Sequence, residues 1–569
     1  MSYDLVIKNG TVVDGTGAKR YQADVAISNG KVAEIGKVTE GAKRTIDAHG
    51  LVVAPGFVDP HTHYDAQICW DGAVTPSSWH GVTSVVMGNC GVGFAPCKPE
   101  QRDMLVRLME GVEDIPEPVL TEGLPWNWQS FPEYLDRLDA RRFDMDIAAQ
   151  VPHAALRVFV MGERGAAREP ATEADRATMA RLAAEGIRAG ALGFSTSRTL
   201  NHKSVDGQPT PTLNAAEEEL STIARAIGET GAGWLQVISD FGDIIEPEFA
   251  MLRRLVTLSG RPMTTTVLER DSKPQEWRRL LDLIAEANAA GQKMTGMVLT
   301  RPTGIMLGFE ISQNPFVECP SWQQVANLPF PARIAALRDP SLRARLLAES
   351  PGGPVMTARL RRWDRIFPLG DPADYEPSAN RSIGAEARRL GVEPAALAYD
   401  RLLENDGRTI LYRPLSNYAD GTLETVREMM AHPNTLIGLG DGGAHVSILC
   451  DASAMTYGLT HWTRDRASGR FPVEWMIRRL TRDNARALGL HDRGVIAPGL
   501  KADLNVIDHG HLTLHAPHVV YDLPAGGRRL MQRADGYVAT VLSGEIVSRD
   551  GAPTGRLPGR LVRGAQAAA

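Results

Sequence analysis

Cysteine is scarce in this sequence, and its few cysteines form no recognisable pair. Five occur among 569 residues, none in a Cys-x-x-Cys motif: Cys69, Cys90, Cys97, Cys319 and Cys450. An odd, scattered set of this kind argues against the disulfide framework of a small secreted protein. We therefore expect the chain to fold in a reducing compartment, the cytoplasm.

Long apolar runs are also absent from the sequence, and we expect no secretory signal. No uninterrupted apolar stretch reaches the roughly 18 residues that a membrane-spanning helix needs. The start, MSYDLVIKNG, has no apolar core behind a basic segment, which a secretory signal would require. We expect neither a membrane span nor a membrane partner.

Positive charge is not concentrated anywhere along the chain. The formal net charge is -6 and no stretch is dense in lysine or arginine, which argues against a nucleic-acid partner. The hydrophobic share of 43% and the charged share of 23% are those of an ordinary globular protein, longer than one average domain. The low aromatic content, 6%, and the mildly acidic balance allow a homo-oligomer without requiring one.

Both ends of the chain have the pattern of short strands joined by tight turns. Asn9-Gly10 and Asn29-Gly30 each separate short apolar segments, and Asn-Gly is a preferred two-residue hairpin turn. Segments 502–508 and 537–547 have the same β-rich texture. The pattern predicts one small β-sandwich assembled from both termini, residues 1–55 plus 486–569.

The middle of the chain alternates apolar strands with segments of helical periodicity, such as 173–188 and 215–230. Such alternation predicts an α/β fold with a parallel sheet, and eight units would close a (β/α)8 TIM barrel over residues 56–485. The stretch at about 300–433 is too long for one crossover, so we expect a helical insertion there, near the barrel mouth. The eight predicted strands are 57–63, 82–89, 146–151, 190–195, 233–238, 262–267, 293–298 and 435–440.

Two histidines follow the first predicted strand, in the motif Pro55-Gly-Phe-Val-Asp-Pro-His-Thr-His63. His61 and His63 alternate, so both side chains point to the same side of the strand. At the carboxyl end of a barrel strand that side is the catalytic face, where two imidazoles can bind one divalent metal ion. The alternative is a pair of ordinary loop histidines.

The opening motif resembles the first strand of the amidohydrolase superfamily. The next predicted strand ends in Gly88-Asn-Cys-Gly91, which is similar to the N-acyl-D-amino-acid deacylase branch of that superfamily. The resemblance extends over nearly the whole chain and implies a metal-dependent amidohydrolase. Further matching segments are GLPWNW at 123–128, ALGFST at 191–196, LGDGGAH at 439–445 and RGVIAPGLKAD at 493–503.

The resemblance implies roles for two further residues. In the deacylase branch the cysteine at the position of Cys90 is a metal ligand, and a divalent cation lowers a thiol pKa enough to make it a thiolate. The aspartate after the eighth strand, here Asp441, binds metal and also accepts a proton from the attacking water. A buried structural thiol and a turn aspartate are the respective alternatives.

The second-metal pocket of the deacylases lacks two of its three ligands in this sequence. The family has a histidine at the end of the fifth strand and another at the end of the sixth, but 233–240 and 262–271 contain none. The fourth strand has no lysine that could be carboxylated into a bridging ligand. The remaining set of His61, His63, Cys90 and Asp441 predicts one metal ion per chain, Zn²⁺, with an open position for water.

Four other residues are candidates for substrate binding. His153, after the third strand, matches the family's histidine there; it could add another imidazole, hold a reacting carbonyl or be structural. Gln236 lies near the missing fifth-strand ligand and could be its hydrogen-bonding substitute. Arg270 follows the sixth strand, where the deacylases place a basic residue that recognises the substrate carboxylate. His445 lies four residues after Asp441, where it could orient the substrate or Asp441, or simply begin a helix.

The sequence therefore predicts a hydrolase of carbon–nitrogen bonds other than peptide bonds, acting on a small-molecule amide. Because Glu269, Arg270 and Asp271 replace the family's pattern after the sixth strand, the substrate is expected to lie outside the range of the ordinary deacylases. Two alternatives remain open: an N-acyl-D-amino-acid deacylase proper, and a metal-free binding or scaffold protein on the same fold.

Overall fold

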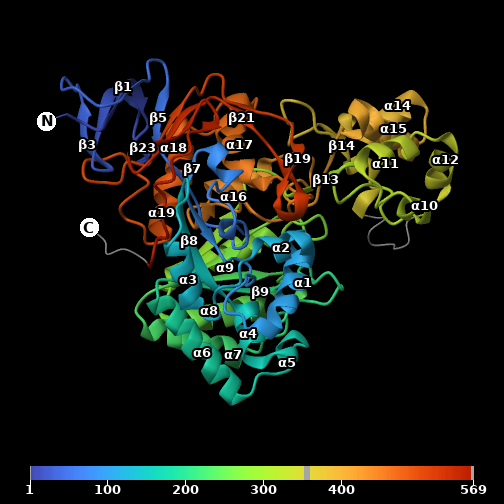
Figure 1. Ribbon diagram of the computed structural model, residues 1–569, viewed down its shortest axis with the longest axis horizontal. Helices are drawn as coiled ribbons and strands as arrows, with labels where there is room; N and C mark the ends of the chain where they lie inside the picture. The colour runs from blue at the N-terminus through green and yellow to red at the C-terminus, as the bar shows by residue number, and fades with distance from the viewer. Residues whose placement is uncertain (1, 351–358, 565–569) are drawn as a thin grey trace.

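A parallel eight-stranded sheet lies at the centre of the molecule (Figure 1). The structure is a computed structural model that describes residues 2–350 and 359–564. All eight predicted barrel strands are present and neighbours in the sheet follow chain order, which confirms the α/β barrel fold. The strands are β6 (Phe57–Asp59), β7 (Val82–Met87), β8 (Asp146–Pro152), β9 (Gly193–Arg198), β10 (Trp234–Ser239), β11 (Met263–Thr266), β12 (Met294–Val298) and β16 (Thr435–Ile437).

The first and last barrel strands are joined by a few hydrogen bonds instead of a regular ladder. The Asn484 side-chain amide donates to the carbonyl oxygens of Val58 (2.8 Å) and Ile437 (2.7 Å) and so spans the seam below the barrel mouth. At the mouth, the Asp441 N–H donates to the His61 carbonyl at 3.1 Å, and the His63 N–H donates to Gly442 at 2.8 Å. Closure of the barrel therefore brings the His61 and Asp441 segments side by side.

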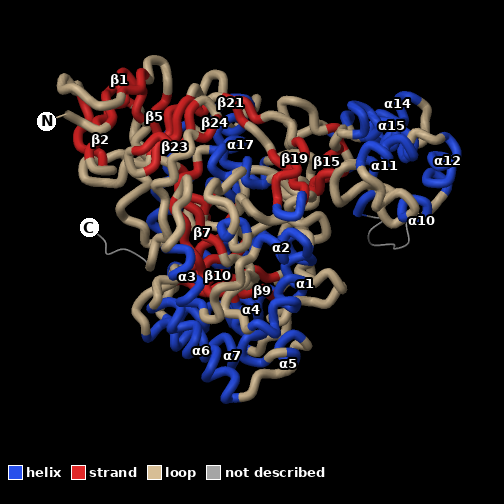
Figure 2. Tube along the Cα trace, in the orientation of Figure 1, coloured by secondary structure: helices blue, strands red, loops and turns tan. Residues whose placement is uncertain are grey.

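Helices cover the outside of the barrel, as Figure 2 shows for α6 (Glu173–Arg188) and α7 (Glu217–Glu229). Thr172 caps α6 and forms a capping box with Asp175, so the helix begins at Glu173. In α7 the buried residues Leu220, Ile223, Ala224 and Ile227 recur at helical spacing. Helix α8 (Ile245–Ser259) follows β10, and helix α9 (Glu276–Ala289) follows β11.

Strands from both ends of the chain form a second, nine-stranded sheet with an apolar core of its own. Antiparallel pairing of β5 with β17 joins the two ends. Figure 1 shows this sheet beside the N-terminus, in blue and red. Its strands are β1 (Leu5–Val12), β2 (Tyr21–Ser28), β3 (Lys31–Gly36), β4 (Thr45–Asp47), β5 (Val52–Pro55), β17 (Leu504–Ile507), β22 (Tyr537–Leu542), β23 (Glu545–Arg549) and β24 (Ala552–Pro553).

One of the two Asn-Gly hairpin predictions is confirmed, and the other is wrong. At Asn29-Gly30 the chain makes a two-residue turn between β2 and β3, with Ser28 opposite Lys31. At Asn9-Gly10 the chain continues as the single strand β1, and the register shifts there in a bulge. Asn9 adopts a φ of 60°, and a backbone in the left-handed region suits a bulge as well as a turn. Gly10 is needed because a Cβ there would lie 2.5 Å from Val53 Cγ2.

Two parts of the C-terminal region leave the nine-stranded sheet and pack against the barrel. The Val562 N–H donates to Ile147 of β8 at 2.7 Å. The hairpin of β19 (His518–Leu523) and β20 (Gly527–Met531) reaches the barrel mouth, where the Leu530 N–H donates to Val446 at 2.6 Å. The predicted domain limits, 1–55 plus 486–569 and 56–485, remain a prediction.

The insertion after β12 contains a helical lobe with a separate apolar core (Figure 1, right). A small antiparallel sheet of β13 (Gly304–Leu307), β15 (Leu411–Pro414) and β14 (Phe367–Pro368) connects the lobe to the barrel. Part of the predicted range, residues 351–358, lies outside the described residues. The helices of the lobe are α10 (Pro320–Gln323), α11 (Phe330–Leu337), α12 (Pro340–Ala348), α14 (Ile383–Leu390) and α15 (Pro394–Gly407).

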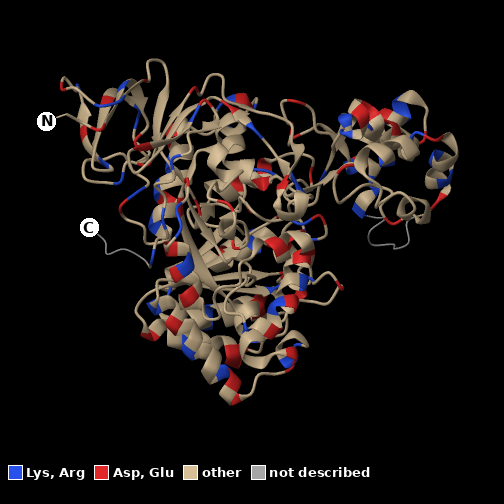
Figure 3. Ribbon diagram, in the orientation of Figure 1, with Lys and Arg blue, Asp and Glu red and all other residues tan. Residues whose placement is uncertain are grey.

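Lysine and arginine are interspersed with aspartate and glutamate over the elements seen in Figure 3. Such mixing gives no support for a polyanion-binding face. Within residues 2–350 and 359–564, none of the helices combines the length and the apolar character needed to cross a membrane.

A buried ion-pair cluster ties the first residue of β8 to the segment that precedes β17. Asp146 lies 2.7 Å from Arg493 Nη1 and 2.6 Å from Lys501 Nζ. Burial alone would raise the pKa of the Asp146 carboxyl, but Lys501 and Arg493 hold it below its usual value. Since the folded-state pKa is lowered, this contribution to stability is present at neutral pH and is lost as the pH falls below about 4.

We expect Asp146→Asn to lower the free energy of unfolding by about 3–5 kcal/mol at pH 7, because it leaves two buried cations without their shared carboxylate. Denaturant unfolding of both forms measures the change. Asp136→Asn is the matched control: Asp136 pairs with Arg563 at 2.7 Å, but 70% of its side chain is exposed, so little change is expected. Equal effects of the two substitutions would contradict the prediction.

Candidate functional site

The carboxyl end of β6 places two buried histidines at the barrel mouth. His61 is 1% exposed and His63 is 2% exposed. Ligand atoms of His61, His63 and Cys90 all lie within 4.8 Å of one another. This spacing is short enough for one ion to contact all three side chains, so the structure brings these predicted ligands together.

Cys90 lies in a tight loop after β7, with a φ of 54° between glycines that are also in the left-handed region. Its Sγ is 3.3 Å from His61 Nε2. The neighbouring Gly91 has no room for a side chain, because a Cβ there would lie 2.8 Å from Thr196 Cα. A left-handed conformation in a non-glycine residue costs about 1–3 kcal/mol and persists only where the surroundings impose it.

Polar side chains from the next barrel strands impose this loop conformation. Gln236 on β10 accepts a hydrogen bond from the Cys90 N–H at 2.9 Å. Ser195 on β9 accepts from the Gly91 N–H at 2.9 Å, and Gln150 on β8 donates to Asn89 at 2.7 Å. Gln236 thus holds the cysteine loop, although it was expected to contact substrate from the position of the missing fifth-strand ligand.

Asp441 approaches the two histidines from the opposite side of the barrel seam. Its Oδ1 lies 3.3 Å from His61 Nε2 and 3.7 Å from His63 Nε2. That oxygen is buried and has no hydrogen-bond partner within the described part of the chain. Asp441 has a φ of 45°, and the two backbone hydrogen bonds across the seam hold it there.

The donor atoms of this cluster fit a divalent cation. Burial lowers the pKa of His61 to about 3 and that of His63 well below its usual value, so both imidazoles are neutral with a free lone pair. The pKa of the Cys90 thiol is raised, chiefly by burial and next by the negative charge of Asp441. Burial, followed by the charges of Asp451 and Asp59, raises that of Asp441. Two neutral imidazoles beside two buried acids are the ligand chemistry of zinc, whose charge would stabilise both anions.

Glu113 is a buried acidic residue at this site that the sequence-based prediction missed. It is the last residue of α1 (Arg102–Glu113) and only 1% exposed. Its Oε1 lies 3.2 Å from His63 Nδ1, and its Oε2 lies 3.7 Å from His445 Nε2. One signal for it exists in the sequence, since Glu113 continues the apolar i, i+4 series of Leu105 and Met109.

His445 and His202 lie near the histidine–cysteine cluster but are not part of it. His445 has a φ of 50°. Its ring contacts Glu113, and no bond in the described structure joins it to Asp441. His202, also missed, follows β9 and shares a hydrogen bond of 2.9 Å with Ser197 through Nδ1. After burial, the charge of His202 is the next cause of the lowered pKa of His61 and of His445.

Two predicted substrate-binding residues have other partners in the structure. His153 is fully buried and its ring nitrogens contact Thr196 Oγ1 at 2.9 Å and Glu219 Oε1 at 2.8 Å. Arg270 donates to the Ser239 carbonyl at 3.3 Å and lies 3.5 Å from Glu276. The structure therefore does not bring either residue into the histidine–cysteine cluster.

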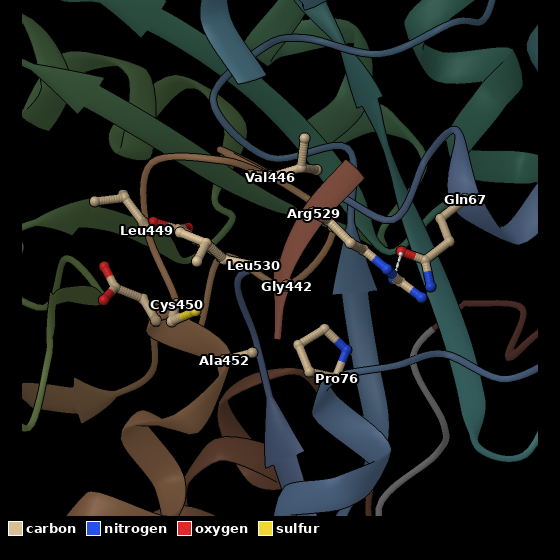
Figure 4. A pocket seen from close by; sticks show the side chains of 13 residues that line it. Gln67, Pro76, Gly442, Val446, Leu449, Cys450, Ala452, Arg529 and Leu530 are labelled. Carbon is tan, nitrogen blue, oxygen red and sulfur yellow. Dashed lines mark hydrogen bonds between the residues drawn. The ribbon is translucent and has the colours of Figure 1, made fainter. Parts of the chain in front are cut away.

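A small cavity borders the Asp441 turn on the side of the β19–β20 hairpin (Figure 4). Arg529 and Gln67 line it and are joined by a hydrogen bond of 3.1 Å, drawn as a dashed line. Arg529 is also paired with Asp522 at 2.8 Å through both oxygens. Because these bonds occupy the guanidinium, we interpret Arg529 as an anchor of the hairpin at the barrel mouth.

Comparisons with known proteins agree with this geometry. The model of the amidohydrolase family matches residues 44–548. D-aminoacylase of Alcaligenes xylosoxydans xylosoxydans is 27% identical over 98% of this chain and 97% of its own, and N-acyl-D-aspartate deacylase of the same organism is 27% identical over 90% and 86%.

Solved structures of two such enzymes have the same fold. A D-aminoacylase with a binuclear metal centre has a TM-score of 0.66 at 24% identity, with 99% of this chain and 100% of that chain covered. N-acyl-D-glutamate deacylase from Bordetella bronchiseptica, complexed with zinc and a phosphonate inhibitor, also has a TM-score of 0.66, at 22% identity and the same coverage.

Proposed function

Since this chain belongs to the amidohydrolase family and is thereby a metal-dependent hydrolase of non-peptide carbon–nitrogen bonds, we propose that it cleaves a small-molecule amide with a single zinc ion. The proposed ligands are His61, His63, Cys90 and Asp441. The observation that carries the proposal is the convergence of two neutral imidazoles, a thiol and an unpartnered carboxylate oxygen at the end of β6.

Two functions are assigned to Asp441 in the reaction. A divalent ion at this position would polarise the scissile carbonyl and lower the pKa of the attacking water. The carboxylate, one-fifth exposed and with no hydrogen bond to its Oδ1 in the described structure, accepts the proton of that water and delivers it to the leaving nitrogen.

One ion, and no second, is proposed because two positions of a binuclear site have other residues here. The side-chain oxygen of Gln236 on β10 already accepts a hydrogen bond from the Cys90 N–H. After β11 the first acidic residue, Glu269, accepts hydrogen bonds from the Ala419 N–H (2.9 Å) and Thr425 Oγ1 (2.9 Å). It is thereby bound to the first turn of α16 (Glu424–Ala431) and the loop before it. The D-aminoacylase neighbour is described as activated by one metal and attenuated by a second, which is in keeping with a one-metal enzyme.

The substrate is proposed to be a small N-acyl compound, because the relatives are deacylases. Arg270 pairs with Glu276 and is not directed to the cluster, so recognition of a carboxylate as in an ordinary deacylase lacks support at that position. An N-acyl-D-amino-acid deacylase is the second candidate, favoured by the match to D-aminoacylase over 98% of this chain. Assay of acylated D- and L-amino acids beside other amides separates the two candidates.

We propose the cytoplasm as the site of action. All five cysteines are buried and free, and Cys90 must stay reduced to bind metal.

We expect elemental analysis of the purified protein to find about one zinc or similar ion per chain. Removal of the ion by a chelator abolishes turnover, and addition of one equivalent of Zn²⁺ restores it. Two ions per chain would mean that residues after β10 and β11 bind metal after all. No bound metal, even after zinc is supplied, would contradict the proposed function and favour the scaffold alternative.

A further inference from the structure

Glu113 is a carboxylate in a place where burial makes a charge costly. It is 1% exposed, so its charged form loses nearly all of its hydration. A buried charge without a cation destabilises a fold. Glu113 therefore has no evident value for stability, and another reason must account for its position.

The partners of Glu113 suggest that reason. Its Oε1 is 3.2 Å from His63 Nδ1, while the other ring nitrogen of His63, Nε2, faces Asp441 at 3.7 Å. His63 Nδ1 is buried and has no hydrogen-bond partner in the described chain, so the Glu113 oxygen at 3.2 Å is an acceptor within reach of it. For Nε2 to present its lone pair to a metal, Nδ1 has to carry the proton, and an acceptor beside Nδ1 selects that tautomer.

The second oxygen of Glu113 reaches toward the barrel mouth. Oε2 lies 3.7 Å from His445 Nε2, and among described residues it has no hydrogen-bond partner. His445, with its φ of 50°, belongs to the same turn as Asp441. The carboxylate thus stands between the two imidazoles and contacts each with a different oxygen.

We propose that Glu113 is a positioning residue of the metal centre: it accepts the Nδ1 proton of His63, orients that ring and raises its basicity, while His445 lies beside the other carboxylate oxygen. This inference rests on the proposed metal site. It predicts that Glu113 acts on metal affinity through His63 and contributes nothing to the stability of the metal-free fold.

The test compares Zn²⁺ affinity of the full chain, by competition with a chromogenic chelator, for wild type, Glu113→Gln and Glu110→Gln. Loss of such a carboxylate partner typically weakens metal binding about 10–100-fold, and we expect that for Glu113→Gln. Glu110 is the matched control, on the same helix and bonded to the Glu117 N–H at 3.2 Å, away from the histidines. Its replacement should leave zinc affinity within about twofold.

Two further measurements separate a positioning role from a structural one. The melting temperature of metal-free Glu113→Gln should equal or exceed that of wild type, because a buried carboxyl has been removed. His445→Ala should weaken zinc binding less than Glu113→Gln, and the double variant no more than Glu113→Gln alone, since both changes act through one carboxylate. Should Glu113→Gln fail to fold, Glu113→Asp keeps the charge but withdraws it by one methylene, and the same loss of affinity is expected.

Zinc affinity of Glu113→Gln within twofold of wild type would overturn the inference, as would a lower metal-free melting temperature with unchanged affinity. Either result leaves the proposed function standing if wild type binds one ion and His61→Ala loses it. Failure of wild type to bind zinc would instead count against the proposed function itself.

Discussion

Replacement of His61 or His63 by alanine is expected to remove the bound metal and to reduce kcat/KM by about 10⁴-fold or more. Both imidazoles are buried within 4.8 Å of the Cys90 thiol, and alanine leaves too few ligands for a stable site. The loss of a Lewis acid is worth several kcal/mol, and each 1.36 kcal/mol corresponds to a tenfold change in rate. Metal content and turnover are measured on the same preparation.

The matched control is His511→Ala, because 87% of the His511 side chain is exposed and it pairs only with a neighbour on the surface, Asp508. It should keep both metal and activity. Circular dichroism and thermal melting establish that the ligand variants remain folded. Full activity in either His61→Ala or His63→Ala would refute the assigned site.

Asp441→Asn is expected to lower kcat by about 10²–10⁴-fold, the usual contribution of a general acid–base. The amide has nearly the same shape but cannot accept the water proton. With His61, His63 and Cys90 intact, three ligands remain and zinc should still be found at about one ion per chain. KM should change less than kcat, because the lost function belongs to the transition state.

Asp420→Asn serves as the control for the loss of one aspartate, since Asp420 is exposed and lies outside the site. Retention of wild-type kcat by Asp441→Asn would remove Asp441 from the role of proton carrier. Loss of zinc together with activity would assign Asp441 to metal binding alone.

Much of the fold was predictable from local patterns in the sequence. All eight barrel strands lie where apolar segments alternate with helical ones, and α6 spans the predicted range 173–188. The His61–His63 pair was predictable too, because alternation along one strand is a local property that any parallel strand preserves. The bulge at Asn9-Gly10 was not, since Asn-Gly permits the left-handed backbone of both a bulge and a hairpin.

The sequence by itself determined the barrel, the strand-end histidines and the loss of histidines from the fifth and sixth strands, because each is encoded within a few consecutive residues. Only the tertiary structure decided that Gln236 holds the Cys90 loop, that His153 pairs with Glu219, and that Glu113 contacts Nδ1 of His63. These contacts join segments that are far apart in the chain. Their geometry depends on how the barrel closes and how α1 packs across its mouth, which no local pattern of residues specifies.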